Sequence, residues 1–260
     1  MRLCSLAAGS LGLMVIGYAG SGNMARALAL GLALEDPALF TDGGSGRAAA
    51  LAAEVGGEAV GSNQELGQRA QLIVLAHKPA QLEAVAREIG SVPVVLSLLG
   101  GVTVAALGAA YPEARVVRAM PNTAVEVRRG VTCVCGAAVA EVEELFGRVG
   151  TVVRLAERLM DAATAVSGVA PAYVALIAEA WVDAAVGQGI PAAIAAELVA
   201  DSLAGSAALL LAHHMDTLSV RRAVTSPGGV TARGLRALEQ AGLRSAFTDA
   251  AAAVVGPRVK

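Results

Sequence analysis

Two glycine-containing turns and one lysine-containing segment of this sequence combine residue types that can bind anions. The first turn follows an apolar run and opens a helical pattern, and in it Gly20, Gly22 and Ala25 fit the spacing GxGxxA. The first glycine permits a tight turn, the second lets the backbone approach a pyrophosphate, and the third small residue lets helix and strand pack closely. The free N–H groups at the start of the helix face the phosphates. This context predicts a dinucleotide-binding turn.

Asp42 comes 20 residues after Gly22, at the end of the second predicted strand. A carboxylate there would accept a hydrogen bond from a ribose 2′-hydroxyl and favour NAD. Ser45 and Arg47 in the following loop could instead bind a 2′-phosphate. A solvated turn also explains Asp42, so the sequence leaves both NADH and NADPH open.

The second turn spans residues 226–231 and reads Ser-Pro-Gly-Gly-Val-Thr. Gly228 and Gly229 leave backbone N–H groups unshielded just before a helical pattern, an arrangement that suits a carboxylate. The Thr231 hydroxyl can both donate and accept a hydrogen bond. A plain helix cap explains the same residues. Lys78 follows an apolar run, at the edge where parallel sheets bind ligands, and a surface lysine is the alternative.

Strands and helices must alternate in the first part of the chain to position these segments. Apolar strands joined by helices imply a parallel sheet covered on both faces, and beyond Asp161 the pattern becomes entirely helical. We therefore predict two domains, residues 1–156 and 157–260. The expected strands are 13–17, 38–41, 72–76, 92–98, 116–119 and 130–135, and the expected helices are 23–34, 46–55, 79–89, 162–186, 191–212, 231–240 and 244–254.

The composition narrows the class of protein. Apolar residues make up 55% of the 260 residues, charged residues 16%, and the net charge is −2. These values exclude a disordered chain and argue against nucleic-acid binding. The apolar runs 162–178 and 192–212 are interrupted or charged, so we expect no membrane span, and the surplus apolar surface predicts an oligomer. Residues 1–13 form only a weak export signal, and the three cysteines show neither a disulfide framework nor zinc spacing; we expect a cytoplasmic protein without a metal.

Taken together, several motifs make the chain resemble pyrroline-5-carboxylate reductase. They are the turn at 17–25, Leu-Ala-His-Lys-Pro at 75–79, Arg-Ala-Met-Pro-Asn-Thr at 118–123 and the turn at 226–231, and the resemblance extends from Met14 to Val254. It implies a Rossmann-like N-terminal domain followed by an all-α dimerisation domain, forming a homodimer that in this family can assemble into a decamer. The implied reaction is hydride transfer from NADPH or NADH to the C=N carbon of 1-pyrroline-5-carboxylate, which gives L-proline in the last step of proline biosynthesis.

The resemblance also implies roles for individual residues. Thr231 is the residue nearest to a catalytic one, because its hydroxyl can contact the ring nitrogen. The residues expected to bind the substrate are Glu157, Ser226, Gly228, Gly229, Val230 and Thr231. The residues expected to bind the cofactor are Gly17, Gly20, Ser21, Gly22, Asn23, Met24, Asp42, Asn63, Ala76, His77, Lys78, Pro79 and Gly100.

Some positions depart from the family pattern. Val169 and Ala170 stand where most members have Ser and Gly, His77 where a small apolar residue is usual, and Arg222 where an acidic residue is expected. The first pair adds bulk and removes a hydroxyl near the expected substrate pocket. Two alternatives to proline synthesis follow: reduction of another cyclic imino acid, or a regulatory protein that binds a dinucleotide with little catalysis.

Overall fold

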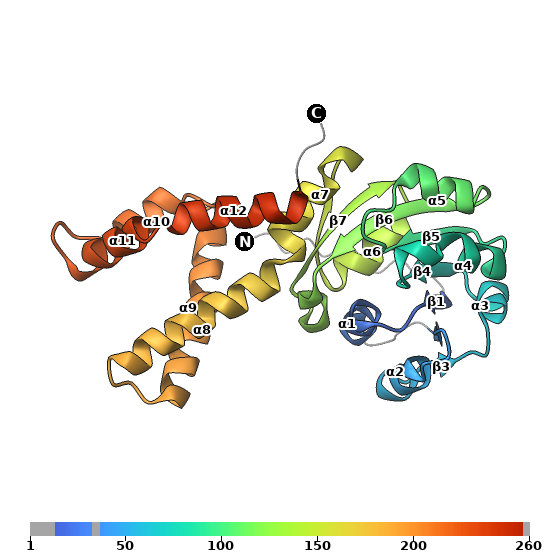
Figure 1. Cartoon of the computed structure of the whole chain (residues 1–260), viewed down its shortest axis with the longest axis horizontal. Helices are drawn as coiled ribbons and strands as arrows, with labels where there is room; N and C mark the ends of the chain where they lie inside the picture. Colours follow the sequence, from blue (N-terminus) through green and yellow to red (C-terminus); the bar gives the residue numbers. More distant parts are fainter. Residues whose placement is uncertain (1–13, 33–36, 257–260) are drawn as a thin grey trace. The chain divides into compact units, whose positions relative to one another are not determined.

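A computed structural model describes residues 14–32 and 37–256. Residues 1–13, with the weak export signal and Cys4, lie outside this range, and so do residues 33–34 at the end of the first expected helix. The backbone divides into two compact units between Gly168 and Val169 (Figure 1).

The first unit is built on an eight-stranded sheet with the order β3-β2-β1-β4-β5-β6-β7-β8. Strands β1 to β6 pair in parallel. This arrangement confirms the expected α/β class and places the first strand at the centre of the nucleotide-binding half. The strands are β1 (Ile16–Ala19), β2 (Ala38–Thr41), β3 (Glu58–Ala59), β4 (Leu72–Leu75), β5 (Val94–Ser97), β6 (Arg115–Pro121), β7 (Gly130–Gly136) and β8 (Gly150–Arg154).

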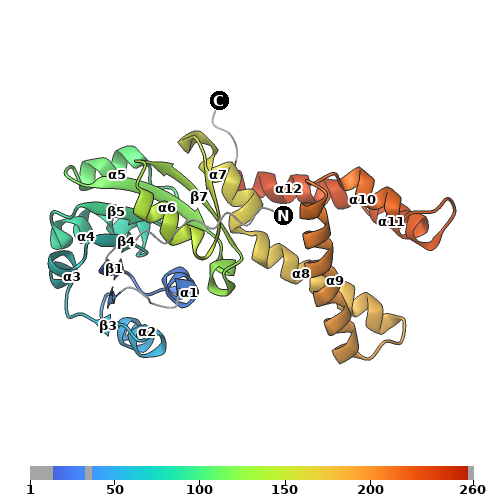
Figure 2. The same ribbon diagram turned by 180° about the vertical axis from the view of Figure 1, so that it is seen from behind.

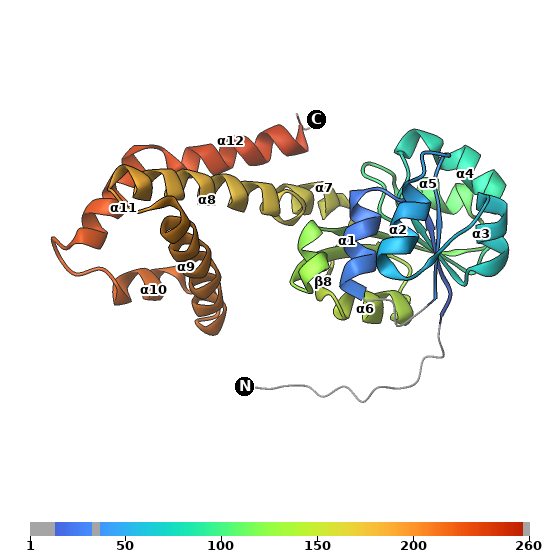
Figure 3. The same cartoon turned by 90° about the horizontal axis from the view of Figure 1, so that it is seen from below.

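Helices cover both faces of the sheet. One apolar cluster contains Leu28, Leu51 and Phe146 from α1, α2 and α6, and another contains Leu66 and Leu107 from α3 and α5. Figure 3 shows α1 and α2 on one side of the sheet and α3 and α4 on the other. The helices are α1 (Asn23–Leu32), α2 (Arg47–Val55), α3 (Asn63–Arg69), α4 (Leu82–Ile89), α5 (Val104–Ala110) and α6 (Ala140–Gly147).

The structure corrects two expectations about the strands. The first strand was expected at 13–17 but runs over Ile16–Ala19, because Tyr18 and Ala19 are fully buried in the sheet. Strands β7 and β8 run antiparallel to the others, since β7 pairs antiparallel with β6. The link from β6 to β7 holds only a 3₁₀ helix, η2 (Thr123–Val127), and is too short for the crossover that a parallel strand would need.

The first unit extends past residue 156, where the sequence placed the boundary, to Gly168. Residues 157–168 form η3 (Glu157–Leu159), α7 (Met160–Ala163) and a π-helical turn (Thr164–Gly168). Met160 is fully buried against Cys133 and Cys135 of β7. The buried Asn122 donates from Nδ2 to the carbonyl of Ser167 at 3.0 Å. These contacts fasten the segment to the sheet.

The second unit is helical throughout its described residues, as expected. It consists of α8 (Ala170–Gly187), α9 (Ala192–Ala212), α10 (Thr217–Ala223), α11 (Val230–Gln240) and α12 (Leu243–Val255). Helices α8 and α9 pack against each other (Figure 2). Among the described residues of this unit, only Ala195 and Val199 are buried. By length and composition alone, the helical stretches 157–187 and 192–212 could cross a membrane.

Candidate functional site

The glycine turn forms at the carboxyl end of β1. Gly20 has φ +104°, and a Cβ there would lie 2.7 Å from the backbone of Ala76 and His77, so only glycine fits. A Cβ on Gly22 would meet nothing within 4 Å. Helix α1 begins at Asn23, directly after these glycines. The turn thus packs tightly against β4 on one side and leaves open space above the helix N-terminus, where a phosphate group fits.

A pocket of about 590 Å³ opens over this turn. It lies at the carboxyl ends of β1, β2 and β4, the edge at which such sheets bind ligands. Eight of the expected cofactor residues line it, together with Gly43, Ser45, Arg47 and Gln81. The eight are Gly20, Ser21, Gly22, Asn23, Asp42, Ala76, His77 and Lys78.

The other expected cofactor residues do not line this pocket. Gly17 lies inside β1, where a Cβ would come within 3 Å of Ala70, Ile73 and Leu66, so this glycine serves the packing of α3 and β4. Met24 is the second residue of α1, Pro79 begins the 3₁₀ helix η1 (Pro79–Gln81), and Gly100 lies in the turn after β5.

The structure shows Asp42 bound within its own turn, one of the two roles that the sequence left open, and the ribose contact stays a prediction. Its Oδ1 accepts from the backbone N–H of Gly44 and Ser45 at 2.8 and 3.1 Å. Its Oδ2 accepts from the Ser45 hydroxyl and the N–H of Ala48 at 3.0 and 2.9 Å. The N–H of Ala48 contributes most to lowering the pKa of Asp42 below its usual value. A carboxylate has about four lone-pair positions, so the loop uses the whole acceptor capacity of Asp42.

Asn63 is linked by hydrogen bonds to Ser21 in the wall of the pocket. Ser21 donates from its hydroxyl to the carbonyl of Thr41 at 2.9 Å, and the Thr41 hydroxyl donates to Asn63 Oδ1 at 2.7 Å. Asn63 Nδ2 donates to Glu88 at 2.7 Å. Because a carboxylate only accepts, this contact fixes the orientation of the amide. Sequence reasoning did not identify Thr41 or Glu88, since neither belongs to a motif.

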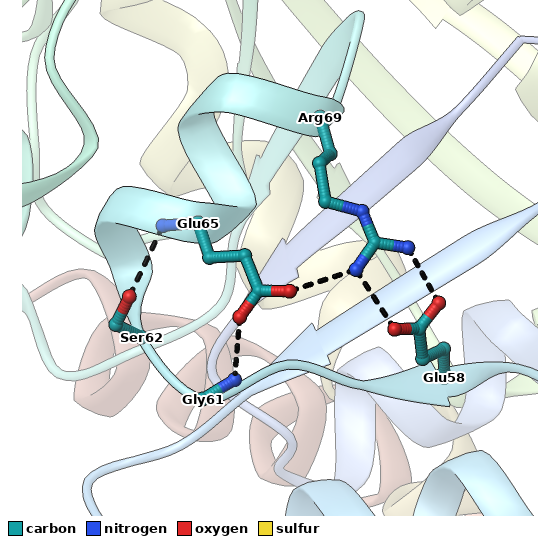
Figure 4. Close-up of polar contacts among 5 residues, drawn as sticks. All are labelled: Glu58, Gly61, Ser62, Glu65 and Arg69. Atoms are coloured by element: carbon teal, nitrogen blue, oxygen red, sulfur yellow. Dashed lines mark hydrogen bonds and ion pairs between the residues drawn. The ribbon is translucent and has the colours of Figure 1, made fainter.

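Helix α3, which carries Asn63, is fixed by polar contacts at both ends (Figure 4). The Ser62 hydroxyl accepts from the N–H of Glu65 at 3.1 Å, and the Glu65 carboxylate accepts from the N–H of Gly61 at 3.0 Å. Arg69 pairs with Glu65 at 2.8 Å and with Glu58 of β3 at 2.5 Å. The ion pairs raise the pKa of Arg69 and lower that of Glu58. The helix therefore holds Asn63 at a fixed place.

Glu157 lies in a cluster around a buried arginine. The Arg118 side chain is only 4% exposed and lies 3.5 Å from Glu157 and 3.1 Å from Asp161. Glu157 Oε1 also accepts from the N–H of Val104 at 2.6 Å, at the first turn of α5. Within the first unit, Glu157 thus joins β6 to α5 through an ion pair, the role that the sequence alone favours. The substrate contact that the resemblance implies stays a prediction. The burial of Arg118 could not be seen in the sequence.

The other expected substrate residues lie together in the second unit. Gly228 has φ +69°, and the N–H of Gly229 donates to the carbonyl of Ser226 at 3.0 Å. Helix α11 starts at Val230, so the turn ends at a helix N-terminus that carries Thr231 in its first turn. Val230 is exposed and Thr231 half-buried. The N–H groups at the start of α11 and the hydroxyl of Thr231 therefore lie in one helical turn, an arrangement that suits an anion. Among the described residues of the chain, no cluster of three or more His, Cys, Asp or Glu residues is arranged to hold a metal ion.

Comparisons with known proteins cover both units. The family model described as pyrroline-5-carboxylate reductase dimerisation matches residues 157–257, and that described as NADP oxidoreductase coenzyme F420-dependent matches residues 15–99. The pyrroline-5-carboxylate reductase of Synechocystis is 38% identical over 197 residues, which cover 72% of this chain and 74% of that protein. The pyrroline-5-carboxylate reductase of Escherichia coli is 35% identical over 252 residues, which cover 90% of this chain and 93% of that protein.

Solved structures agree with these matches. The 1-pyrroline-5-carboxylate reductase of Streptococcus pyogenes superposes with a TM-score of 0.85 at 28% identity, covering 93% of this chain and 96% of that one. The pyrroline carboxylate reductase of Plasmodium falciparum with NADP bound gives a TM-score of 0.83 at 27% identity, covering 93% of this chain and 95% of that one. The resemblance seen in the motifs is confirmed: the chain belongs to the pyrroline-5-carboxylate reductase family.

Proposed function

We propose that this protein reduces 1-pyrroline-5-carboxylate to L-proline with NADPH or NADH. The observation that carries the proposal is the pocket over the glycine turn, which is lined by the expected cofactor residues in a chain of this family. A bound nicotinamide supplies a hydride to the C=N carbon, and the ring nitrogen keeps or gains a proton. The product contains one C–N single bond in place of the double bond.

The second unit supplies the proposed substrate contacts. The backbone N–H groups in the first turn of α11, which follows the Ser226–Gly229 turn, suit the carboxylate of the substrate because they lie at the helix N-terminus. The Thr231 hydroxyl in the first turn of that helix can donate a hydrogen bond to the neutral ring nitrogen, or accept one from the N–H of the protonated ring. A cationic C=N group accepts hydride more readily than a neutral one, so a contact at the nitrogen speeds the transfer.

The charges in the pocket favour NADPH over NADH. Arg47 and Lys78 line the pocket with Asp42, but the Asp42 carboxylate is occupied by its own loop. Two cations against one carboxylate leave a net positive charge in the pocket lining, and we propose that Arg47 binds the 2′-phosphate. Replacing Arg47 by alanine should weaken NADPH binding about tenfold, as expected for a charge-assisted hydrogen bond, and leave NADH binding unchanged.

The proposed assembly is a cytoplasmic homodimer through the helical unit, with a decamer as a further step. Leu176, Trp181 and Leu198 of α8 and α9 are exposed in the single chain, and the unit matches the dimerisation model. We assign this apolar surface to the partner subunit rather than to a membrane. The net charge of −2 supports no nucleic-acid partner.

Steady-state oxidation of NADPH and NADH tests the proposal. Purified protein should oxidise one or both with pyrroline-5-carboxylate and act more slowly on the six-membered ring analogue. Faster turnover of the larger ring would indicate another cyclic imino acid, in line with Val169 and Ala170. Cofactor binding without turnover of either imine would indicate a regulatory protein.

A further inference from the structure

Arg233 of α11 holds its guanidinium group against the turn that precedes this helix. Its Nη1 donates to the carbonyl oxygen of Gly228 at 3.2 Å, and its backbone N–H donates to the carbonyl oxygen of Gly229 at 3.3 Å. Side chains on a helix point back toward its N-terminus, which explains how residue 233 reaches a turn that ends at residue 229. The contact brings a positive charge to the turn that is expected to bind the substrate.

The same turn leads to backbone donors that an anion can use. The N–H of Gly229 is already taken, because it donates to the carbonyl oxygen of Ser226 at 3.0 Å. The following N–H groups, of Val230, Thr231 and Ala232, begin α11 and so lack an acceptor within the helix. The N-cap residue is Gly229, which has no side chain to accept from them. An anion at the start of α11 therefore meets uncapped N–H groups.

Arg233 differs from most arginines of this chain in having no acidic partner. Arg69, Arg118 and Arg244 each form ion pairs with carboxylates. Arg233 is exposed and pairs with no carboxylate in the part of the chain that the structure describes, and the Gly228 carbonyl takes only one of its N–H groups. A guanidinium group stays protonated in proteins and carries several donors in one plane, which match a carboxylate. The side chain thus keeps both charge and donors for a ligand.

We propose that Arg233 is a further substrate-binding residue, whose guanidinium group forms a charge-assisted hydrogen bond with the carboxylate of the cyclic imine. The proposal rests on the proposed function and deepens it, because the contact selects ring imines that carry a carboxylate over those that do not. Arg233 takes no part in hydride transfer. Since the carboxylate is present in both the substrate and the transition state, the contact lowers KM and leaves kcat unchanged.

Steady-state kinetics of the full-length protein with two imines test this assignment. 1-Pyrroline-5-carboxylate carries the carboxylate, and 1-pyrroline is the same ring without it. Arg233→Ala should raise KM for the first imine about tenfold, as expected for one charge-assisted hydrogen bond at an exposed site, with kcat and the KM of NADPH unchanged. It should leave kcat/KM for 1-pyrroline as in the wild type. Arg233→Lys keeps the charge and should recover most of the KM.

Further measurements separate the charge of Arg233 from its support of the turn. Arg233→Gln keeps a donor for the Gly228 carbonyl without the charge, and should behave as the alanine variant does. Added salt should raise KM for 1-pyrroline-5-carboxylate in the wild type more than in the glutamine variant, because salt screens the charge. Inhibition by L-proline, which carries the same carboxylate, should weaken in Arg233→Ala by the same factor as KM.

Arg236→Ala is the matched control. It removes an exposed arginine from the same helix, and the Arg236 side chain forms neither a hydrogen bond nor an ion pair with any residue that the structure describes. The variant should match the wild type with both imines.

Two results overturn the role of Arg233 while leaving the proposed function in place. One is a KM for 1-pyrroline-5-carboxylate that does not change in Arg233→Ala. The other is an equal loss of kcat/KM with both imines, which would show that the side chain only supports the turn. By contrast, a wild-type protein that turns over neither imine would refute the proposed function and the role of Arg233 with it.

Discussion

The two units have similar fractions of apolar residues but bury them differently. In the first unit, helices cover both faces of the sheet, and Tyr18, Phe40 and Phe146 are fully buried. In the second, α8 has no buried residue and α9 has only Ala195 and Val199. The sheet unit builds its own core and its own pocket within one chain. The helical unit leaves its apolar faces for another molecule, so its stability depends on association.

The strongest test of this comparison places a charge on an exposed apolar side chain of each unit. Leu176 of α8 is 65% exposed and Val127 of η2 is 69% exposed. Leu176→Glu should weaken dimerisation more than a hundredfold, because each protomer loses about 2 kcal/mol of apolar burial and also buries a charge. Sedimentation at several concentrations measures the shift from dimer to monomer.

Val127→Glu is the matched control, since it makes the same change at an equally exposed site of the sheet unit. It should leave the dimer intact. If both variants remain dimeric, or if Val127→Glu dissociates the dimer and Leu176→Glu does not, the assignment of the interface to the helical unit is wrong.

The second test concerns the two glycines of the cofactor turn. Gly20→Ala should lower the free energy of unfolding of the cofactor-free protein by about 3 kcal/mol, because φ +104° is strained for alanine and its Cβ would approach the backbone of Ala76 to 2.7 Å. Gly22→Ala should leave that stability unchanged, because its Cβ meets open space, and should weaken NADPH binding. Urea unfolding and a binding titration separate the two effects. Equal destabilisation by both variants would contradict the geometry of the turn.

The sequence predicted those parts of the fold that follow from local patterns. Residues 38–41 form β2 as expected, and α9 follows the apolar run that predicted it. The helix expected at 162–186 begins only at Ala170, because residues 164–168 form a π-helical turn that belongs to the first unit. Helix α3 was missed because only Leu66 among its seven residues is buried, which leaves no apolar periodicity to detect. Strand β3 has only two residues, both exposed.

The pocket was predicted more fully than the contacts of its residues. The glycine turn and the segment after β4 lie together because parallel strands end at one edge of the sheet. The loop of Asp42, however, depends on Gly44 and Gly46 at positive φ, and their conformation determines what the carboxylate meets. Arg118 is buried through contacts with residues about 40 positions away, and no local pattern shows this.

The third test asks whether the two units contribute separately to catalysis. Thr231→Ala should reduce kcat/KM by roughly 10- to 100-fold, since it removes one hydrogen bond to a developing charge. The cofactor pocket lies in the first unit, so the dissociation constant of NADPH should not change. Thr231→Ser keeps the hydroxyl and should recover most of the activity. An unchanged kcat/KM in the alanine variant would exclude the role given to Thr231.

The smallest effect is expected from the loop of Asp42, and it depends on pH. The hydrogen bonds that lower the pKa of Asp42 in the folded protein stabilise it above the ordinary carboxyl pKa of about 4, and this contribution is lost as the pH falls through the lowered value. Asp42→Asn removes acceptors from the loop and should cost about 1 kcal/mol at pH 7. The difference from wild type should shrink in acid, because the wild-type carboxyl is then protonated too. Urea unfolding at both pH values measures it, with the same substitution at the exposed Asp249 as a control. A difference that stays constant between pH 7 and strong acid would show that the charge of Asp42 does not hold the loop.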